Sequence, residues 1–363
     1  MNGLVITHPG MEAIAQQEIH EMISRDAAIA PSVCTFPIAA YTELAILAYR
    51  GQSFIKVLLL LDTLPADAGF LDALRERAAR YPLAPFFPSP ASTFRVHCTR
   101  VGHERYSGAE IAEAAGSAVS HPVDLEQPDV IIYAYLFQDQ AYIGIDIAGF
   151  DLSKRDYKIF HIPSSIKGTL AYAAVRNAAG AAHLLDPLCG SGEIAIEAAL
   201  YLRRVSPHFF RKDAFLFTKL PQFASFSFAA IDALQRPSPS KITAGDSQFR
   251  CIHATQKNAQ IANIRDAITF SRLDIEWLDT KFPKESIGLI ASRIPPGAAR
   301  KTLSELFYQA AYILTPAGRL SLLTAAPAAL LAEAAHHPFH CAAEHSIWQG
   351  KEQFALLSCQ RKA

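Results

Sequence analysis

The stretch LLDPLCGSGEIAIEAA, residues 184–199, constrains the fold of this chain more than any other. An apolar strand ends at Asp186, a loop follows with Gly190 and Gly192, and a helix begins near residue 191. Glycines permit a tight turn and let a ligand approach the backbone closely, and a helix start offers free N–H groups. This pattern predicts a ligand site at the carboxyl end of a buried strand.

The rest of the C-terminal half alternates between strands and helices. Strands are expected at 183–186, 241–246 and 267–274, in IGLIAS before a proline loop, and in GRLSLLTA; helices are expected near 248–262 and 300–314 and up to about 335. The segments AAEHSIWQG and EQFALLSCQ are typical of a hairpin. Such alternation predicts an α/β fold with a doubly wound, mainly parallel sheet and an antiparallel terminal hairpin.

The N-terminal half consists of two smaller α+β units. The first has a strand-helix-helix-strand pattern and ends near residue 62, and a proline-rich connector occupies 81–92. In the second, Ser107 and Glu110 form a capping box that opens a helix. A Phe- and Pro-rich insertion at 201–240 is expected to pack as a lid or flank.

Composition narrows the class of protein. With 363 residues the chain is long enough for two or three domains, and 34 basic residues balance 34 acidic ones, which argues against non-specific nucleic-acid binding. The six cysteines are scattered and predict buried, reduced thiols. The longest aliphatic run, VLLLL, is far shorter than the ~20 residues that span a bilayer, so we expect a cytoplasmic protein.

The glycine loop resembles motif I of class I S-adenosylmethionine (SAM)-dependent methyltransferases, in the form found in THUMP-containing RNA guanine methyltransferases. Other segments resemble that family in the same order: HPGMEAIAQQEI, TELAILAYR, STFRVHCTR, DLEQPDVIIYAYLFQDQAYIGIDIAGFDLSKRDYK and AFLFTKLPQF. The resemblance implies an N-terminal ferredoxin-like domain (1–62), a THUMP RNA-binding domain (63–150), a linker (151–165) and a Rossmann-like methyltransferase domain (166–363). The spacing of Gly190, Gly192 and Ala195 also satisfies G-x-G-x-x-A, which leaves a nicotinamide cofactor open.

The resemblance assigns SAM-binding roles to residues of this chain. Asp186, Gly190 and Gly192 would line the methionine end, and Pro187, Cys189 and Ser191 belong to the same loop. Asp246 would accept hydrogen bonds from the ribose hydroxyls, and Asp274 would lie beside the adenine. The segment IPSSIKGTLAYAAVR would be a helix that closes over the cofactor, with Thr169 facing inward.

The loop after the fourth strand, SRIPPG, corresponds to the family's Asn-Pro-Pro-Tyr-Gly motif. In the family, the Asn side chain and a proline-held carbonyl accept the N–H groups of the target amine, and an aromatic ring stacks on the flipped base. Without gaps, Arg293 stands for the Asn, Pro295 for the central proline and Pro296 for the aromatic; the other register puts Ile294 at the Asn. Since guanidinium has no acceptor, Ser292 is the alternative acceptor if the loop shifts by one.

Basic and aromatic residues next to the linker form the predicted RNA contacts: Lys154, Arg155, Tyr157, Lys158 and Lys167. The resemblance implies a SAM-dependent methyl transfer to the exocyclic amine of a guanine in tRNA or rRNA, and it favours tRNA, because the family's THUMP unit often grips the acceptor end of a tRNA. The altered loop keeps open a second reading, a catalytically impaired homologue that binds RNA and SAM. No metal is expected, because HHPFH at 336–340 lacks a matching cysteine or acid grouping.

Overall fold

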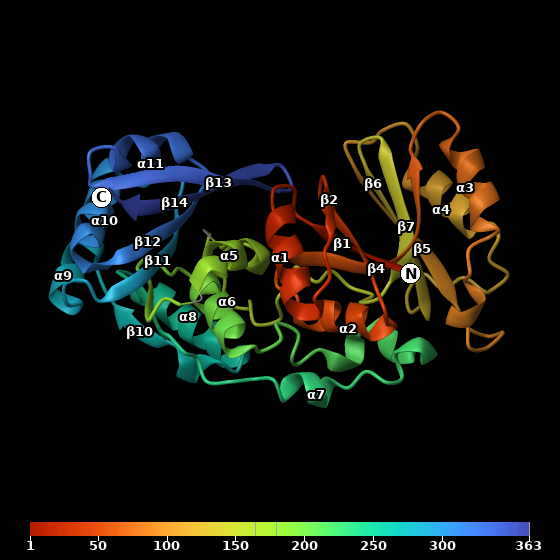
Figure 1. Cartoon of the computed structure of the whole chain (residues 1–363), viewed down its shortest axis with the longest axis horizontal. Coiled ribbons are helices and arrows are strands. Elements are labelled where there is room, and N and C mark those ends of the chain that lie inside the picture. The colour runs from red at the N-terminus through yellow and green to blue at the C-terminus, as the bar shows by residue number, and fades with distance from the viewer. Residues whose placement is uncertain (164, 179, 363) are drawn as a thin grey trace. The chain divides into compact units, whose positions relative to one another are not determined.

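The structure is a computed structural model that describes residues 1–163, 165–178 and 180–362. The chain forms two compact units (Figure 1). Unit 1 comprises Met1–Thr7, Ala15–Leu152 and Phe210–Phe228, and unit 2 comprises His8–Ile14, Ser153–Phe209 and the chain from Ala229 onward. No helix within these described ranges is long and apolar enough to cross a membrane.

Unit 1 is built on one seven-stranded sheet with the strand order β2-β3-β1-β4-β7-β6-β5. The strands are β1 (Asn2–Thr7), β2 (Ala28–Ala30), β3 (Val33–Pro37), β4 (Phe54–Pro65), β5 (Phe94–Val101), β6 (Val130–Phe137) and β7 (Gln140–Asp146). The helices are α1 (Glu12–Ile23), which belongs to this unit from Ala15 onward, α2 (Tyr41–Arg50), α3 (Phe70–Ala78) and α4 (Gly108–Gly116). Helix α4 begins with the predicted capping box.

The predicted boundary at residue 62 falls inside β4. This strand pairs with β1 on one side and with β7 on the other, so the two predicted N-terminal domains share a single sheet. The short strands β2 and β3 were not predicted, because three- and five-residue segments carry too little alternation to be recognised.

Part of the predicted insertion belongs to unit 1. Residues 210–228 bring three phenylalanines, Phe215, Phe217 and Phe228, into one aromatic cluster. The rings of Phe215 and Phe228 also lie 6.0 and 4.9 Å from the ring of Tyr49 on α2. The segment is therefore a packed flank of unit 1.

Unit 2 contains the predicted doubly wound sheet, with the strand order β10-β9-β8-β11-β12-β14-β13. The strands are β8 (His183–Asp186), β9 (Lys241–Asp246), β10 (Thr269–Arg272), β11 (Ile287–Ile294), β12 (Leu314–Thr324), β13 (Phe339–Gln349) and β14 (Glu352–Arg361). The helices are α5 (Gly168–Val175), α6 (Glu193–Arg203), α8 (Phe249–Ile261), α9 (Leu278–Lys281), α10 (Arg300–Ile313) and α11 (Pro327–Ala334), and the short α7 (Phe228–Asp232) precedes β9. All pairings are parallel except those of β14 with β12 and β13.

Helices pack on both faces of this sheet. Along β8, Leu184 joins a core with residues of α5, α6 and α8, and the adjacent Leu185 joins a second core with residues of α10 and α11. Successive strand residues point to opposite faces, so the apolar run of β8 is buried on both sides. The chain order reverses between β8 and β11, where α/β sheets place their ligands.

Two of the sequence expectations need correction. Cys341 on β13 and Cys359 on β14 lie opposite each other and form a disulfide, whereas we predicted reduced thiols throughout. Their separation of 18 residues does not reveal the register that pairs them. The predicted linker 151–165 also belongs to unit 2 from Ser153 onward. Ser164 lies outside the described residues, although it falls within this linker and within the predicted closing helix.

Candidate functional site

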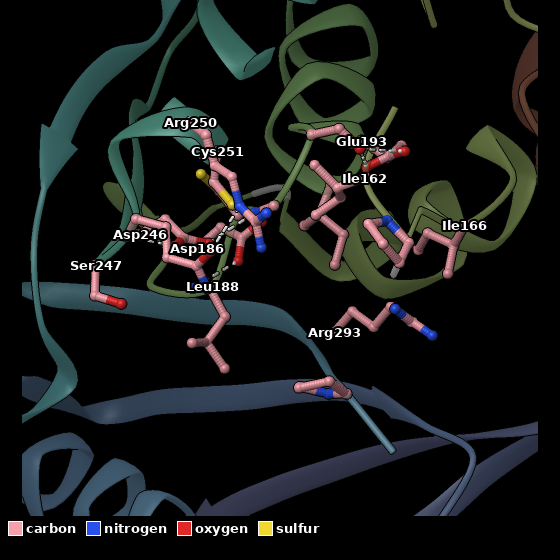
Figure 2. A pocket seen from close by; sticks show the side chains of 17 residues that line it. Ile162, Ile166, Asp186, Leu188, Glu193, Asp246, Ser247, Arg250, Cys251 and Arg293 are labelled. Carbon is pink, nitrogen blue, oxygen red and sulfur yellow. Dashed lines mark hydrogen bonds between the residues drawn. The ribbon is translucent and has the colours of Figure 1, made fainter. Parts of the chain in front are cut away.

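The carboxyl ends of β8, β9 and β11 surround a cavity of about 280 Å³, close to the lower end of the ~300–1,000 Å³ typical of ligand pockets. Asp186 ends β8 and Asp246 ends β9, and both line the cavity (Figure 2). Their side chains are buried. The cavity therefore lies at the switch point that the topology predicts, with the carboxyl groups of both strand ends in its wall.

The glycine loop closes one side of this cavity. Gly190 and Gly192 have φ angles of +57° and +92°, a region that glycine enters without the Cβ penalty. A Cβ atom on Gly192 would lie 2.5 Å from Cγ2 of Thr255, so the loop packs directly on α8. The N–H of Gly190 donates to Oδ2 of Asp246 at 3.2 Å, which joins the loop to the neighbouring strand end. The positive φ angles favour glycine at both positions, and the contact with Thr255 leaves no room for a side chain at Gly192.

Asp186 is a buried carboxyl with an unusual ionisation. Burial, with a smaller contribution from the negative charges of Asp246 and Glu193, raises the pKa of Asp186 to about 7. Two hydrogen bonds act in the opposite direction: the hydroxyl of Ser292 donates to Oδ1 at 2.7 Å, and the N–H of Leu188 donates to Oδ1 at 3.3 Å. The acid is therefore partly protonated near neutral pH.

The proline loop differs in detail from the prediction. Strand β11 continues through Ile294, so Arg293 lies at a strand end, and Arg293 and Pro295 line the cavity. Ser292 is fully buried and is not among the cavity-lining residues, so its predicted role as an alternative acceptor for the target amine is wrong; its hydroxyl donates to Asp186 instead. Pro296 is exposed and is not among the cavity-lining residues.

The predicted cofactor residues fall into two groups. The cavity wall includes Asp186, Cys189, Gly190, Ser191 and Asp246, whereas it does not include Pro187, Gly192, Asp274 and Thr169. Asp274 is exposed and caps a short helix by accepting from the N–H of Glu276. Thr169 is fully buried in α5, and no partner of its hydroxyl is found among the described residues.

Sequence reasoning missed several residues of the wall. Glu193 is the first residue of α6, and Gln248, Arg250 and Cys251 lie at the start of α8, directly after β9. One signal was available: in a parallel sheet, residues that follow each strand end meet at the same edge. The positions after Asp246 could have been found in this way.

The predicted RNA contacts are only partly accessible. Arg155 is buried and forms an ion pair with Glu197 at 2.7 Å, and the hydroxyl of buried Tyr157 donates to the same carboxylate at 2.8 Å. Their assignment as RNA contacts is therefore corrected to a structural role, because a buried pair cannot contact phosphate or base. Lys154 is exposed, and Lys158 and Lys167 are partly exposed.

A doubly wound sheet with an acid at the first strand end, a glycine loop and a second acid one strand away is typical of Rossmann-like domains that bind a nucleoside-containing cofactor. The family model described as RMKL-like, methyltransferase domain matches residues 155–355, and the THUMP domain model matches residues 69–146. The chain belongs to the RMKL-like methyltransferase family and carries a THUMP domain. This excludes the nicotinamide cofactor that the G-x-G-x-x-A spacing left open.

Individual relatives agree with this family. The tRNA (guanine(6)-N2)-methyltransferase of Methanocaldococcus jannaschii is 30% identical over 256 residues, which cover 64% of this chain and 66% of that protein. TrmN from Thermus thermophilus has the same fold, with a TM-score of 0.74 and 22% identity over 99% of both chains. SMU.472, a putative methyltransferase complexed with SAH, gives a TM-score of 0.78 and 18% identity over 100% of this chain and 98% of that chain.

The residues present fit SAM, the methyl donor of this family. Gly190 and Gly192 have no side chains, so a ligand can approach the backbone of the loop closely. Asp246 lines the cavity, and its carboxylate accepts from the N–H of Gly190. Asp246 would hold ribose hydroxyls, and Asp186 and the loop from Cys189 to Ser191 would hold the methionine end. When bound, SAM supplies an electrophilic methyl group, and the chain's own residues orient it and exclude water.

Proposed function

We propose that this protein is a cytoplasmic enzyme that transfers the methyl group of SAM to the exocyclic N2 amine of a guanine in RNA, with tRNA as the substrate class. The observation that carries the proposal is the cavity at the switch point, whose wall combines the glycine loop and Asp246 with Arg293 and Pro295. Support for guanine in tRNA comes from the 30% identity to an enzyme of that name. The THUMP domain supports RNA as the partner.

The chain contributes binding and orientation to this reaction. The exocyclic amine of guanine is a weak nucleophile, since its lone pair is shared with the ring, so acceptors for its two N–H groups would help to localise that pair. Arg293 cannot accept, and Ser292 is fully buried, so the proposal assigns the acceptor role to the backbone carbonyls at 294–296. The amine loses its proton readily once it carries the methyl group, so the proposal requires no strong general base.

The identity of residue 293 also favours a second candidate, a homologue that binds RNA and SAM but transfers the methyl group slowly or not at all. Incubation with methyl-labelled SAM and separate pools of tRNA and rRNA distinguishes the two. The proposal predicts label in tRNA that unlabelled SAH suppresses and that Asp246→Ala abolishes. Label in rRNA instead of tRNA would contradict the substrate class, and intact SAM binding without label in any RNA would favour the second candidate.

A further inference from the structure

Two opposite charges line the cavity at the end away from Asp246. Figure 2 shows Asp246, Ser247 and Cys251 on one side of the cavity and Glu193 and Arg293 on the other. The proposed transfer uses neither charge: a guanidinium cannot accept from an amine, and no role in the transfer falls to the carboxylate. Their presence in the cavity wall therefore needs its own explanation.

The carboxylate of Glu193 is held firmly in place. Its side chain is only 6% exposed, and the hydroxyl of Ser191 donates to its two oxygens at 2.9 and 3.0 Å. The Nζ atom of Lys158 lies 3.4 Å from Oε1. Glu193 is also the first residue of α6, where the helix dipole favours a negative charge. These contacts fix the position of the Glu193 side chain at the edge of the cavity.

Arg293 lies at the end of β11 and lines the same side of the cavity as Glu193 (Figure 2). The charges of Glu193 and Glu352 act on Arg293 and oppose the lowering of its pKa by burial. The guanidinium also lies 6.0 Å from the centre of the Phe354 ring on β14. A guanidinium carries a positive charge, and its planar arrangement of N–H donors suits a carboxylate. The cavity end thus presents one anion and one cation.

We propose that Glu193 and Arg293 form a zwitterion clamp that binds the amino-acid end of the cofactor. Glu193 accepts hydrogen bonds from the α-ammonium group, and Arg293 donates to the α-carboxylate, while Asp246 holds the ribose. A pair of opposite fixed charges matches a group that carries one ammonium and one carboxylate. The inference rests on the cofactor of the proposed function and gives residue 293 a binding role in place of the amine-accepting role of asparagine.

Isothermal titration calorimetry with three ligands tests the clamp. SAH has the whole amino-acid end, decarboxylated SAH lacks the carboxylate, and methylthioadenosine lacks both charged groups. Glu193→Gln and Arg293→Gln should each lower the affinity for SAH by about 10- to 100-fold, as expected for the loss of a hydrogen bond between charged groups. Each should change the affinity for methylthioadenosine by less than about threefold. Arg293→Gln should bind decarboxylated SAH as the wild type does, whereas Glu193→Gln should bind it more weakly.

Arg250→Gln is the matched control, because Arg250 lines the same cavity at the other end and should change the affinity for all three ligands by one common factor. Methylthioadenosine binding also shows that each variant is folded. The clamp is overturned if the Glu193 and Arg293 variants lose affinity for SAH and for methylthioadenosine by the same factor. It is also overturned if the Arg293 variant keeps its SAH affinity but loses RNA affinity, because Arg293 would then bind an RNA phosphate. A wild type that binds no SAH also overturns it, whereas SAH binding through the clamp without methyl transfer to RNA contradicts only the proposed function.

Discussion

Replacing Asp186 with asparagine should stabilise the protein at alkaline pH while it weakens cofactor binding. Burial raises the pKa of this carboxyl from 3.8 to about 7. Asparagine keeps an oxygen at the position that accepts from Ser292 and Leu188, so both hydrogen bonds can persist. The substitution therefore removes the ionisation of residue 186 with little change in shape.

The sign of the effect follows from the raised pKa. Between 3.8 and about 7 the folded chain holds a proton on Asp186 that the unfolded chain has released. The stability that this group contributes is fully present below 3.8 and is lost as the pH rises through about 7. Each pKa unit corresponds to ~1.36 kcal/mol, so the wild type should lose roughly 2–3 kcal/mol of unfolding free energy from this group between about pH 5 and about pH 8.

Urea unfolding followed by tryptophan fluorescence measures this loss. The two tryptophans of the chain, Trp277 and Trp348, both belong to unit 2, so their signal reports the unit that contains Asp186. Other titrating groups are common to both proteins and cancel in the difference between wild type and Asp186→Asn. The reasoning is refuted if the two proteins show the same change in unfolding free energy between the two pH values.

Two other substitutions test the packing of the site. Gly192→Ala should abolish SAH binding in calorimetry and lower the free energy of unfolding by about 1–3 kcal/mol, because the new Cβ would lie 2.5 Å from Thr255 and the φ angle is +92°. Gly297→Ala is the control: its φ angle is +80°, but nothing lies within 4 Å of the new Cβ. It should therefore carry the backbone strain alone and retain SAH binding. Arg155→Met should destabilise unit 2 by about 3–5 kcal/mol, because it leaves the buried carboxylate of Glu197 without its cation. Urea unfolding checks this value, and an Arg155→Met protein that is fully stable but binds RNA weakly would instead support the surface role first predicted for Arg155.

The sequence was sufficient for the sheet of unit 2 and for the two acids and the glycine loop at its strand ends, because strong local patterns specify them. Strand-helix alternation, Asp186, the two glycines and Asp246 carry their structural requirements in residue type and spacing. The disulfide between Cys341 and Cys359 could not be predicted, since it depends on the register of a hairpin.

The predicted RNA contacts failed for a related reason. A basic residue next to an aromatic one is typical both of an RNA-binding surface and of a buried ion pair. Glu197, which decides between the two for Arg155 and Tyr157, lies about 40 residues away in the sequence. Glu193 was missed because a carboxylate at a helix start is ordinarily explained by the helix dipole alone.

The nucleoside product tests the central claim most directly. After incubation of tRNA with the protein and SAM that carries a deuterated methyl group, complete digestion and mass spectrometry identify which nucleoside has gained the label. The account predicts deuterated N2-methylguanosine, and none in a parallel reaction with Asp246→Ala. Label on any other nucleoside, or no labelled nucleoside from a protein that binds SAM, would contradict it.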